Sequence, residues 1–198
     1  MHPLAVSDGG EAELIRRCQA GESAAFDQLV RRHQQQVFAV SLRMLGDYHE
    51  ATEVAQEAFV RAYRAIGSFR SEAKFSTWLF TIATNLCRNR RRWWARRKRV
   101  IAGSLDEPGE TEEGEFAHEV ADPSPDPSSM ALSAELKRHI MRGLAMLDEE
   151  GRAVVVLCDV QGLSYEEAAE VLRIKLGTVK SRLNRARFRL RSLLDGKI

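Results

Sequence analysis

The spacing of apolar residues predicts helices along the whole chain. Apolar positions recur three and four residues apart in both halves, and no segment sustains the two-residue alternation of a half-buried strand. In the N-terminal part we expect helices over about 11–20, 24–45 and 48–66, and a fourth from about 76 onward. In the C-terminal part we expect helices that start near 133, 148, 165 and 178, roughly, by the same spacing. The fold class is therefore predicted to be all-α.

Local signals mark where several of these helices begin and end. Gly46 follows an apolar stripe and is expected to adopt the left-handed conformation of a helix C-cap. Asp47 with Glu50 resembles a capping box, in which a side chain at the helix start binds the backbone three residues on. Ser164 with Glu167 has the strict form of this motif. These signals place helix starts after residues 47 and 164.

Charge is strongly segregated, although the formal net charge is only +2. Residues 73–105 carry nine Lys and Arg and no acid, and residues 106–127 carry nine Asp and Glu and no Lys or Arg. Residues 173–198 carry nine Lys and Arg and one acid. Two basic blocks attract polyanions, which makes nucleic acid the leading class of partner.

The acidic block is predicted to separate two domains. It holds four of the five prolines, together with serines and glycines, and few apolar residues. Such a composition buries too little apolar surface to offset the entropy of folding. We therefore expect a flexible acidic linker over residues 102–130, between a domain over 10–101 and a second domain over 131–198.

Several classes of protein find no support in the sequence. The longest apolar run, residues 153–158, is far shorter than the roughly 20 residues of a membrane-spanning helix, and the N-terminus shows no signal-peptide pattern. We expect a cytoplasmic protein without membrane insertion. Cys18, Cys87 and Cys158 show no zinc-site spacing and are expected to be buried thiols, while His33 on an apolar stripe is expected to be a core histidine. No catalytic pair or phosphate-binding loop stands out, so no enzyme, metal, cofactor or small-molecule substrate is predicted.

The last predicted helix has the features of a DNA-recognition helix. Its apolar edge must face the short helix over about 165–172, and the turn between the two is tight. Its remaining surface is basic and polar. Side chains near the start of such a helix reach base edges in the major groove, and later arginines contact phosphates. A basic surface helix in an unrelated bundle is the alternative interpretation.

A second region combines aromatic and basic residues. Between Phe69 and Trp94, arginines and a lysine alternate with three phenylalanines and all three tryptophans. Aromatic rings stack on unpaired bases, so this composition suits single-stranded DNA. Trp78 and Phe80 have an alternative role in a small helical core, and Trp93 and its neighbour could cap the end of that core. Readers of duplex and of single-stranded DNA on one chain indicate a protein that finds duplex DNA and holds it open.

Five sequence stretches carry a resemblance to a known family. They are AFDQLV (25–30), AQEAFVRAY (55–63) and FSTWLFTIA (75–83) in the first domain, and DVQGLSYEEAAEVL (159–172) and GTVKSRL (177–183) in the second. The first three are similar to region 2, and the last two to region 4, of bacterial extracytoplasmic-function sigma factors of the sigma-70 family. With these stretches in this order, the resemblance covers nearly the whole chain outside the linker and the ends.

The resemblance implies two helical domains that bind promoter DNA and core RNA polymerase. Region 4 would bind the −35 duplex through Thr178, Lys180, Ser181, Arg182, Asn184, Arg185 and Arg189. Region 2 would bind the melted −10 strand through Phe69, Ser71, Lys74, Phe75, Trp78, Asn85, Arg88 and Arg92. The region 2 helix with Glu53, Gln56 and Glu57 would dock on the clamp helices of the polymerase β′ subunit, and region 4 on the β flap. Docking would account for an acidic helix face without a partner inside its own domain.

The resemblance also implies an anti-sigma partner and a role for the linker. The carboxylates of the linker would stand in for nucleic-acid phosphates near the polymerase cleft. In the alternative interpretation, the linker is a charged tether that only sets how far apart the two domains can lie. Three departures concern region 4, one of which is Leu147-Asp148-Glu149-Glu150 in place of the usual Leu-Pro opening of its helix. Residues 174–176 precede Gly177 without the proline of many relatives, and Asn184 stands where a different side chain is common, so no −35 sequence preference is carried over.

Two other functions remain open at this stage. A conventional helix-turn-helix regulator would bind duplex DNA alone and would need a dimer interface, but it gives no role to the aromatic and basic region. An adaptor would bind polymerase and no DNA. Loss of −35-dependent initiation on substitution of Arg182 and Arg185 by alanine would separate a sigma factor from such an adaptor.

Overall fold

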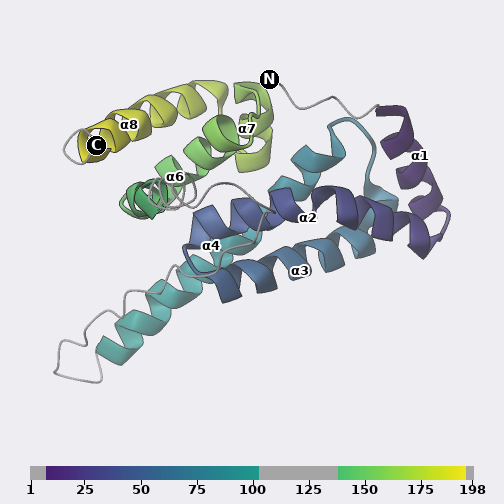
Figure 1. Cartoon of the computed structure of the whole chain (residues 1–198), viewed down its shortest axis with the longest axis horizontal. Coiled ribbons are helices and arrows are strands. Elements are labelled where there is room, and N and C mark those ends of the chain that lie inside the picture. Colours follow the sequence, from purple (N-terminus) through teal and green to yellow (C-terminus); the bar gives the residue numbers. More distant parts are fainter. Residues whose placement is uncertain (1–7, 103–137, 195–198) are drawn as a thin grey trace, which may run out of the picture.

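The computed structural model describes residues 8–102 and 138–194, and both parts are helical (Figure 1). The N-terminal unit holds α1 (Asp8–Gln19), α2 (Ser23–Leu45), α3 (Tyr48–Ala65), a 3₁₀ turn (Ile66–Ser68) and α4 (Phe75–Ala102). The C-terminal unit holds a helix over residues 138–145, α6 (Glu149–Val155), a π-helical turn (Val156–Val160), α7 (Tyr165–Leu172) and α8 (Leu176–Leu194). The described residues contain no strand, so the all-α prediction is confirmed.

The N-terminal unit is a bundle of α2, α3 and α4, with α1 packed on α2. Leu29, Val37 and Met44 of α2 are fully buried against apolar side chains of the other two helices. The chain turns between α2 and α3 because Gly46 adopts a left-handed φ of 77° and Asp47 accepts a hydrogen bond from Glu50 N at 2.8 Å. Both caps were predicted. The C-terminal half of α4 extends beyond the bundle (Figure 1).

The C-terminal unit is built around α6, α7 and α8. The predicted capping box is confirmed: Ser164 accepts from Glu167 N, and the Glu167 side chain accepts from Ser164 N. Arg173 then takes a left-handed φ of 54°, so the chain reverses at once. As a result α8 begins at Leu176, two residues before the predicted start, and the turn is shorter than expected. Two helices joined in this way form a helix-turn-helix.

The two units contact each other. In Figure 1, α7 lies beside the start of α4, and these two helices pack together. The π-helical turn and α6 pack on α2. The start of α4 is therefore covered by α7 on one side, while Leu79, Ala83 and Leu86 of α4 are buried in the core.

Some predictions concern residues outside the described part. The linker predicted over 102–130 lies there except for Ala102, the last residue of α4, and so does the helix start expected near 133. Among the cysteines, Cys18 and Cys87 are buried as predicted, whereas Cys158 is only half-buried. Within the described ranges no helix is both long and apolar enough to cross a bilayer.

Candidate nucleic-acid interface

The exposed side of α8 carries the residues predicted to bind the −35 duplex. Val179, Leu183 and Ala186 are buried, which fixes the rotation of the helix. The opposite surface presents five predicted side chains to solvent, and these are Lys180, Ser181, Asn184, Arg185 and Arg189. Thr178 and Arg182 are half-buried at its edge. The structure therefore brings five of the seven predicted residues onto one open face.

Arg182 differs from its neighbours because it is tied to α6. One of its guanidinium nitrogens lies 2.5 Å from a carboxylate oxygen of Glu150, and its side chain is only 19% exposed. Arg185 is exposed, and its Nε lies 3.4 Å from the backbone oxygen of Ser181, within its own helix. Arg182 thus stabilises the packing of α8 on α6, whereas Arg185 is open to a ligand.

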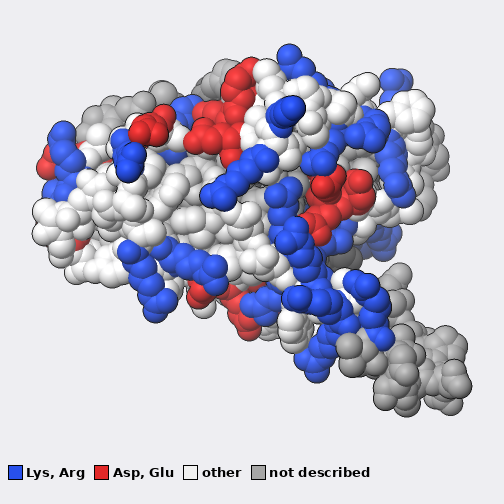
Figure 2. Space-filling view, turned by 180° about the vertical axis from the view of Figure 1, so that it is seen from behind, with Lys and Arg blue, Asp and Glu red and all other residues white. Residues whose placement is uncertain are grey.

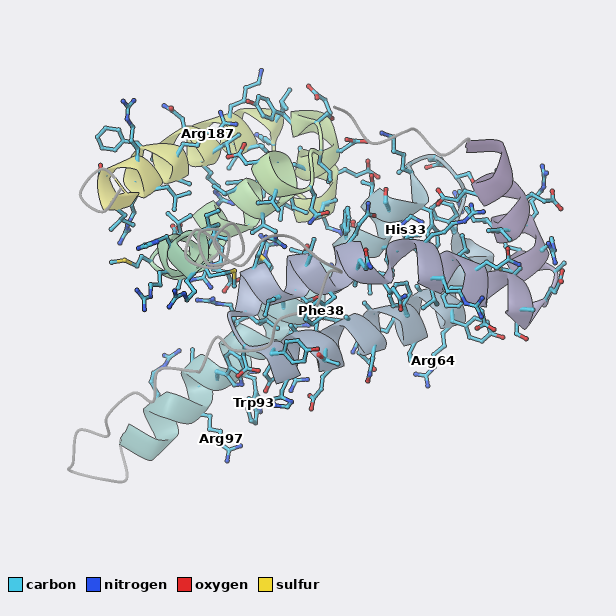
Figure 3. All side chains as sticks on the ribbon, in the orientation of Figure 1. His33, Phe38, Arg64, Trp93, Arg97 and Arg187 are labelled. Atoms are coloured by element: carbon cyan, nitrogen blue, oxygen red, sulfur yellow. The ribbon has the colours of Figure 1, made fainter. Side chains whose placement is uncertain are left out.

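A further arginine of α8, Arg187, is neutralised within the unit. It forms two hydrogen bonds with Asp159, at 3.0 Å from Nε and 2.5 Å from Nη2, and these raise the pKa of the guanidinium above its usual value. Figure 3 shows Arg187 on the part of α8 that follows the predicted base-reading residues. This pair was not predictable from the sequence, because its members lie 28 residues apart.

The aromatic residues predicted for the −10 strand form a packed cluster. The ring centroid of Phe69 lies 5.7 Å from that of Phe75 and 5.1 Å from that of Trp78. Phe75 is 1% exposed and Phe69 is 7% exposed, so only Trp78 has a partly open ring. Gln19 of α1 fixes the same segment, because its Nε2 donates to the backbone oxygens of Ile66 and Phe69. In this conformation the two phenylalanines stiffen the loop before α4.

The polar residues predicted for the −10 strand divide into two groups. Trp78, Asn85 and Arg92 are seven residues apart on α4, two helical turns each, and therefore share one side that faces solvent. Ser71 is also exposed and takes a left-handed φ of 56°. The second group, Lys74 and Arg88, contacts the C-terminal unit.

Lys74 and Arg88 pair with acids of that unit. Lys74 Nζ lies 3.0 Å from Glu167 Oε1, and Arg88 Nε lies 3.7 Å from Glu149 Oε1. The Arg88 side chain is 15% exposed, and burial lowers the pKa of its guanidinium. Arg88 is therefore largely covered, whereas the Lys74 side chain stays 69% exposed beside its acidic partner.

The acidic face predicted to dock on polymerase lies on the outside of α3. Glu53 and Gln56 are exposed and Glu57 is partly exposed. The prediction that this face has no partner inside its domain is wrong for the two acids. Arg90 of α4 lies 3.1 Å from Glu53, and Arg61 lies 2.7 Å from Glu57 one turn on. The second pair has the four-residue spacing of a helical ion pair and was readable from the sequence; the first depends on the bundle.

The end of α4 concentrates positive charge. Figure 2 shows a dense group of Lys and Arg over the part of α4 that extends from the body. Trp93 lies there with 45% of its surface exposed, and the Arg97 guanidinium carbon is 5.1 Å from its ring centroid (Figure 3). Trp93 therefore does not close the core, while Trp94 is half-buried.

The buried histidine is satisfied within the N-terminal unit, as predicted. His33 Nε2 lies 2.6 Å from Glu11 Oε1, and Nδ1 lies 3.4 Å from Gln36 Oε1. The hydrogen bond with His33 holds the pKa of the Glu11 carboxyl below its usual value. In the described part of the chain no three His, Cys, Asp or Glu side chains are grouped to hold a metal.

Comparison with known proteins identifies the two units. Residues 29–99 match the family model for Sigma-70 region 2, and residues 137–190 match that for Sigma-70, region 4. RNA polymerase sigma-H factor of Pseudomonas aeruginosa is 36% identical over 178 residues, which are 89% of this chain and 90% of the relative. ECF RNA polymerase sigma-E factor of Escherichia coli is 35% identical over 187 residues, 93% of this chain and 92% of the relative. The chain belongs to the extracytoplasmic-function sigma factors of the sigma-70 family.

Two solved structures of sigma factors resemble the whole arrangement. CnrH in complex with the cytosolic domain of CnrY has a TM-score of 0.67 and 29% identity, and covers 96% of this chain and 99% of its own. The sigma factor RpoE in complex with the anti-sigma factor NepR from Bartonella quintana has a TM-score of 0.64 and 25% identity. The match covers 87% of this chain and 98% of the RpoE chain. The N-terminal unit is thus sigma region 2, and the C-terminal unit is sigma region 4.

Region 4 also reaches region 2 through a buried arginine that the sequence interpretation missed. Arg152 of α6 is 3% exposed and donates to the backbone oxygens of Met44 (2.9 Å), Ala145 (2.7 Å) and Leu147 (3.2 Å). Burial lowers its pKa to about 10, which leaves it charged at neutral pH. Arg91 of α4 donates to the same Met44 oxygen at 3.0 Å. Arg152 directly precedes the longest apolar run, residues 153–158, and this position was the feature of the sequence that indicated its burial.

Proposed function

We propose that this sigma factor binds core RNA polymerase, recognises −35 and −10 promoter elements and promotes strand opening, with no catalytic reaction of its own. The observation that carries this proposal is the open polar face of α8 in a helix-turn-helix, on the same chain as the Trp78–Asn85–Arg92 stripe of α4. One surface suits duplex DNA and the other suits a separated strand.

The −35 element is assigned to the exposed face of α8. Lys180, Ser181, Asn184 and Arg185 lie on the first turns, where side chains of a recognition helix reach base edges. Arg189 lies further along and suits a phosphate contact. Thr178 and Arg182 also belong to the proposed −35 site, at the edge of this surface. Arg182 in addition pairs with Glu150 of α6.

The −10 strand is assigned to α4 and the loop before it. Trp78 offers a partly open ring for stacking and Asn85 offers amide groups for a base edge. Arg92, and Ser71 in the loop before α4, suit the strand backbone. Phe69 and Phe75 support the loop from below instead of stacking on bases. Lys74 and Arg88 complete the set when their acidic partners are withdrawn.

The remaining partners are assigned from surfaces and relatives. Glu53, Gln56 and Glu57 on α3 suit basic side chains of the polymerase β′ clamp helices, with exchange of their internal pairs for intermolecular ones. Region 4 is assigned to the β flap. Because RpoE is bound to an anti-sigma factor in its structure, we also assign an anti-sigma partner to this chain. A cytoplasmic location and the domain limits 10–101, 102–130 and 131–198 belong to the same proposal.

Run-off transcription with purified core polymerase tests the function. With a genomic promoter library, addition of the chain should produce discrete transcripts that core polymerase alone does not produce. The Arg185→Ala variant should lose most transcripts, while Arg31→Ala, a change of an exposed arginine on α2, should keep them. Duplex binding as a dimer without any effect on transcription would instead support a conventional regulator.

A further inference from the structure

An exposed aromatic ring lies in the middle of the proposed −35 surface. Phe188 of α8 is 75% exposed, more than any other large apolar side chain in the described residues. It follows Ser181 by two helical turns, so the two side chains project from the same side of α8. Exposed Asn184 and Arg185 lie one turn before Phe188, on either side of this line. The ring therefore continues the surface that is assigned to the −35 duplex.

The ring takes no part in the packing of region 4. The inner edge of α8 consists of Val179, Leu183 and Ala186, which are buried, and Phe188 lies on the opposite side of the helix. A ring that stays in water contributes no apolar burial to the stability of the domain. Single exposed apolar residues are common on protein surfaces. What distinguishes Phe188 from them is its place in line with side chains that suit base edges.

The charges around the ring favour a nucleic acid over a protein partner. The sequence has no Asp or Glu between residues 173 and 194. Arg187 is neutralised within the unit, but three other arginines near the ring are exposed, and these are Arg185, Arg189 and Arg191. A protein surface that covered the ring would have to neutralise these guanidinium groups as well. The phosphates on both sides of a DNA groove do so directly.

The major groove offers one apolar group to such a ring, the C5 methyl of thymine. The other groups on its base edges are hydrogen-bond donors and acceptors, and phenylalanine is among the side chains that contact this methyl. At 1.5 Å per residue, Phe188 lies about 10 Å along α8 from Ser181. That distance corresponds to about three base pairs. The ring is thus placed for a base beyond those assigned to the first turns of α8.

We propose that Phe188 contacts the C5 methyl of a thymine in the −35 duplex, about three base pairs from the base edge beside Ser181. Phe188 is then a specificity residue of region 4, because it favours thymine at that position over bases without the methyl. The arginines around it add affinity that does not depend on sequence. This inference rests on the proposed −35 surface and adds to it one residue and one chemical group of the DNA.

The test uses the full chain bound to core polymerase. The probe is a fluorescein-labelled duplex fragment of a promoter found by run-off transcription, and its affinity is read by fluorescence anisotropy. In a series of probes, each thymine of the −35 region on either strand is replaced in turn by uracil, which removes the methyl and keeps the base pair. Phe188→Ala removes the ring. The control, Met146→Ala, shortens another exposed apolar side chain of region 4, outside α8.

We expect wild type to lose about fourfold in affinity when uracil replaces one particular thymine, the effect of one buried methyl group. Phe188→Ala should bind the unmodified probe about tenfold more weakly than wild type, and uracil at that position should cause no further loss. Such non-additivity shows that the ring and the methyl act as a pair. Uracil at the other thymines should affect both proteins equally, and Met146→Ala should bind every probe as wild type does.

The fold of the variant is checked separately. Because the ring is exposed, Phe188→Ala should unfold at the same urea concentration as wild type. Phe188→Leu keeps an apolar side chain and should keep part of the sensitivity to the same methyl, so it replaces the alanine variant if that variant loses helical content.

Equal losses at every uracil in wild type and in a folded Phe188→Ala variant would overturn the contact. Wild-type affinity of this variant for the unmodified probe would overturn it as well. Weaker binding of the variant to core polymerase without DNA, with no difference between the uracil probes, would assign the ring to a protein partner instead. These results are distinguishable from failure of the proposed function. In each of them the wild-type chain still directs core polymerase to promoters, whereas in that failure it stimulates transcription from no template.

Discussion

Replacing Arg152 by methionine removes the buried guanidinium while keeping much of its volume. Three hydrogen bonds from the charged side chain to backbone oxygens are lost, at 2.9, 2.7 and 3.2 Å. Such bonds contribute about 1.5–3 kcal/mol each. Part of this loss is offset because methionine has no charge to desolvate, so we expect a net loss of about 2–4 kcal/mol.

Two of the three acceptors, Ala145 and Leu147, belong to region 4 itself, so region 4 should carry most of the loss. A helical domain of about 60 residues has a free energy of unfolding of roughly 3–9 kcal/mol. The substitution should therefore remove a large share of the free energy of unfolding of region 4. The midpoint of urea unfolding of region 4 should fall by at least roughly 1 M.

The chain offers a way to follow the two regions separately. All three tryptophans lie on α4 in region 2, so tryptophan fluorescence reports region 2, while far-ultraviolet circular dichroism reports both. For Arg152→Met, urea unfolding followed by circular dichroism should show a transition at low urea concentration. Unfolding followed by tryptophan fluorescence should lack this transition. Arg152→Lys, which keeps the charge but loses the planar fork, should fall between wild type and methionine. A dichroism midpoint unchanged from wild type would refute a net stabilising role for the buried arginine.

Three further predictions concern single residues. Gly151→Ala should destabilise region 4 by about 1–3 kcal/mol, seen by circular dichroism, because the added Cβ would lie 2.5 Å from Asp148 Oδ1 and 3.3 Å from the Ala186 side chain. The Glu11 pKa is lowered from 4.5 in the folded chain, so ionised Glu11 stabilises region 2 above that pH and the stabilisation disappears as pH falls through the lowered pKa. Glu11→Gln should therefore flatten the pH dependence of fluorescence-monitored unfolding, and an unchanged slope would contradict the His33 contact. Arg185→Ala should weaken −35 duplex binding about tenfold with an unchanged unfolding midpoint, whereas Arg182→Ala should lower the midpoint because its pair with Glu150 is lost; equal midpoints in the two variants would show that this pair has no structural role.

Features set by neighbours in the sequence were predictable. The capping box at Ser164 and Glu167 and the left-handed Gly46 depend on a few adjacent residues, and both were found where expected. The rotation of α8 also followed from its apolar spacing, which placed Val179 and Leu183 inward and Arg185 outward. One turn of helix is enough to fix such features.

Features set by contacts between helices were not predictable. Phe75 was a reasonable candidate for stacking on a base, because composition alone does not show on which side of a loop a ring packs. The pair of Glu53 with Arg90 needs the relative position of α3 and α4, and the bond of Arg152 to Met44 joins residues 108 positions apart. A hydrophobic pattern gives the inner face of each helix but not the partner across it.

The carboxylate of Glu167 divides its two oxygens between different tasks. Oε2 accepts from Ser164 N at 2.8 Å, and Oε1 lies 3.0 Å from Lys74 Nζ. Withdrawal of the lysine leaves the first bond in place, so α7 keeps its opening turn when the domains move apart. At Glu167 the rearrangement then exchanges one ion pair for water without unfolding of α7, and rigid-body domain motions run on the microsecond to millisecond scale.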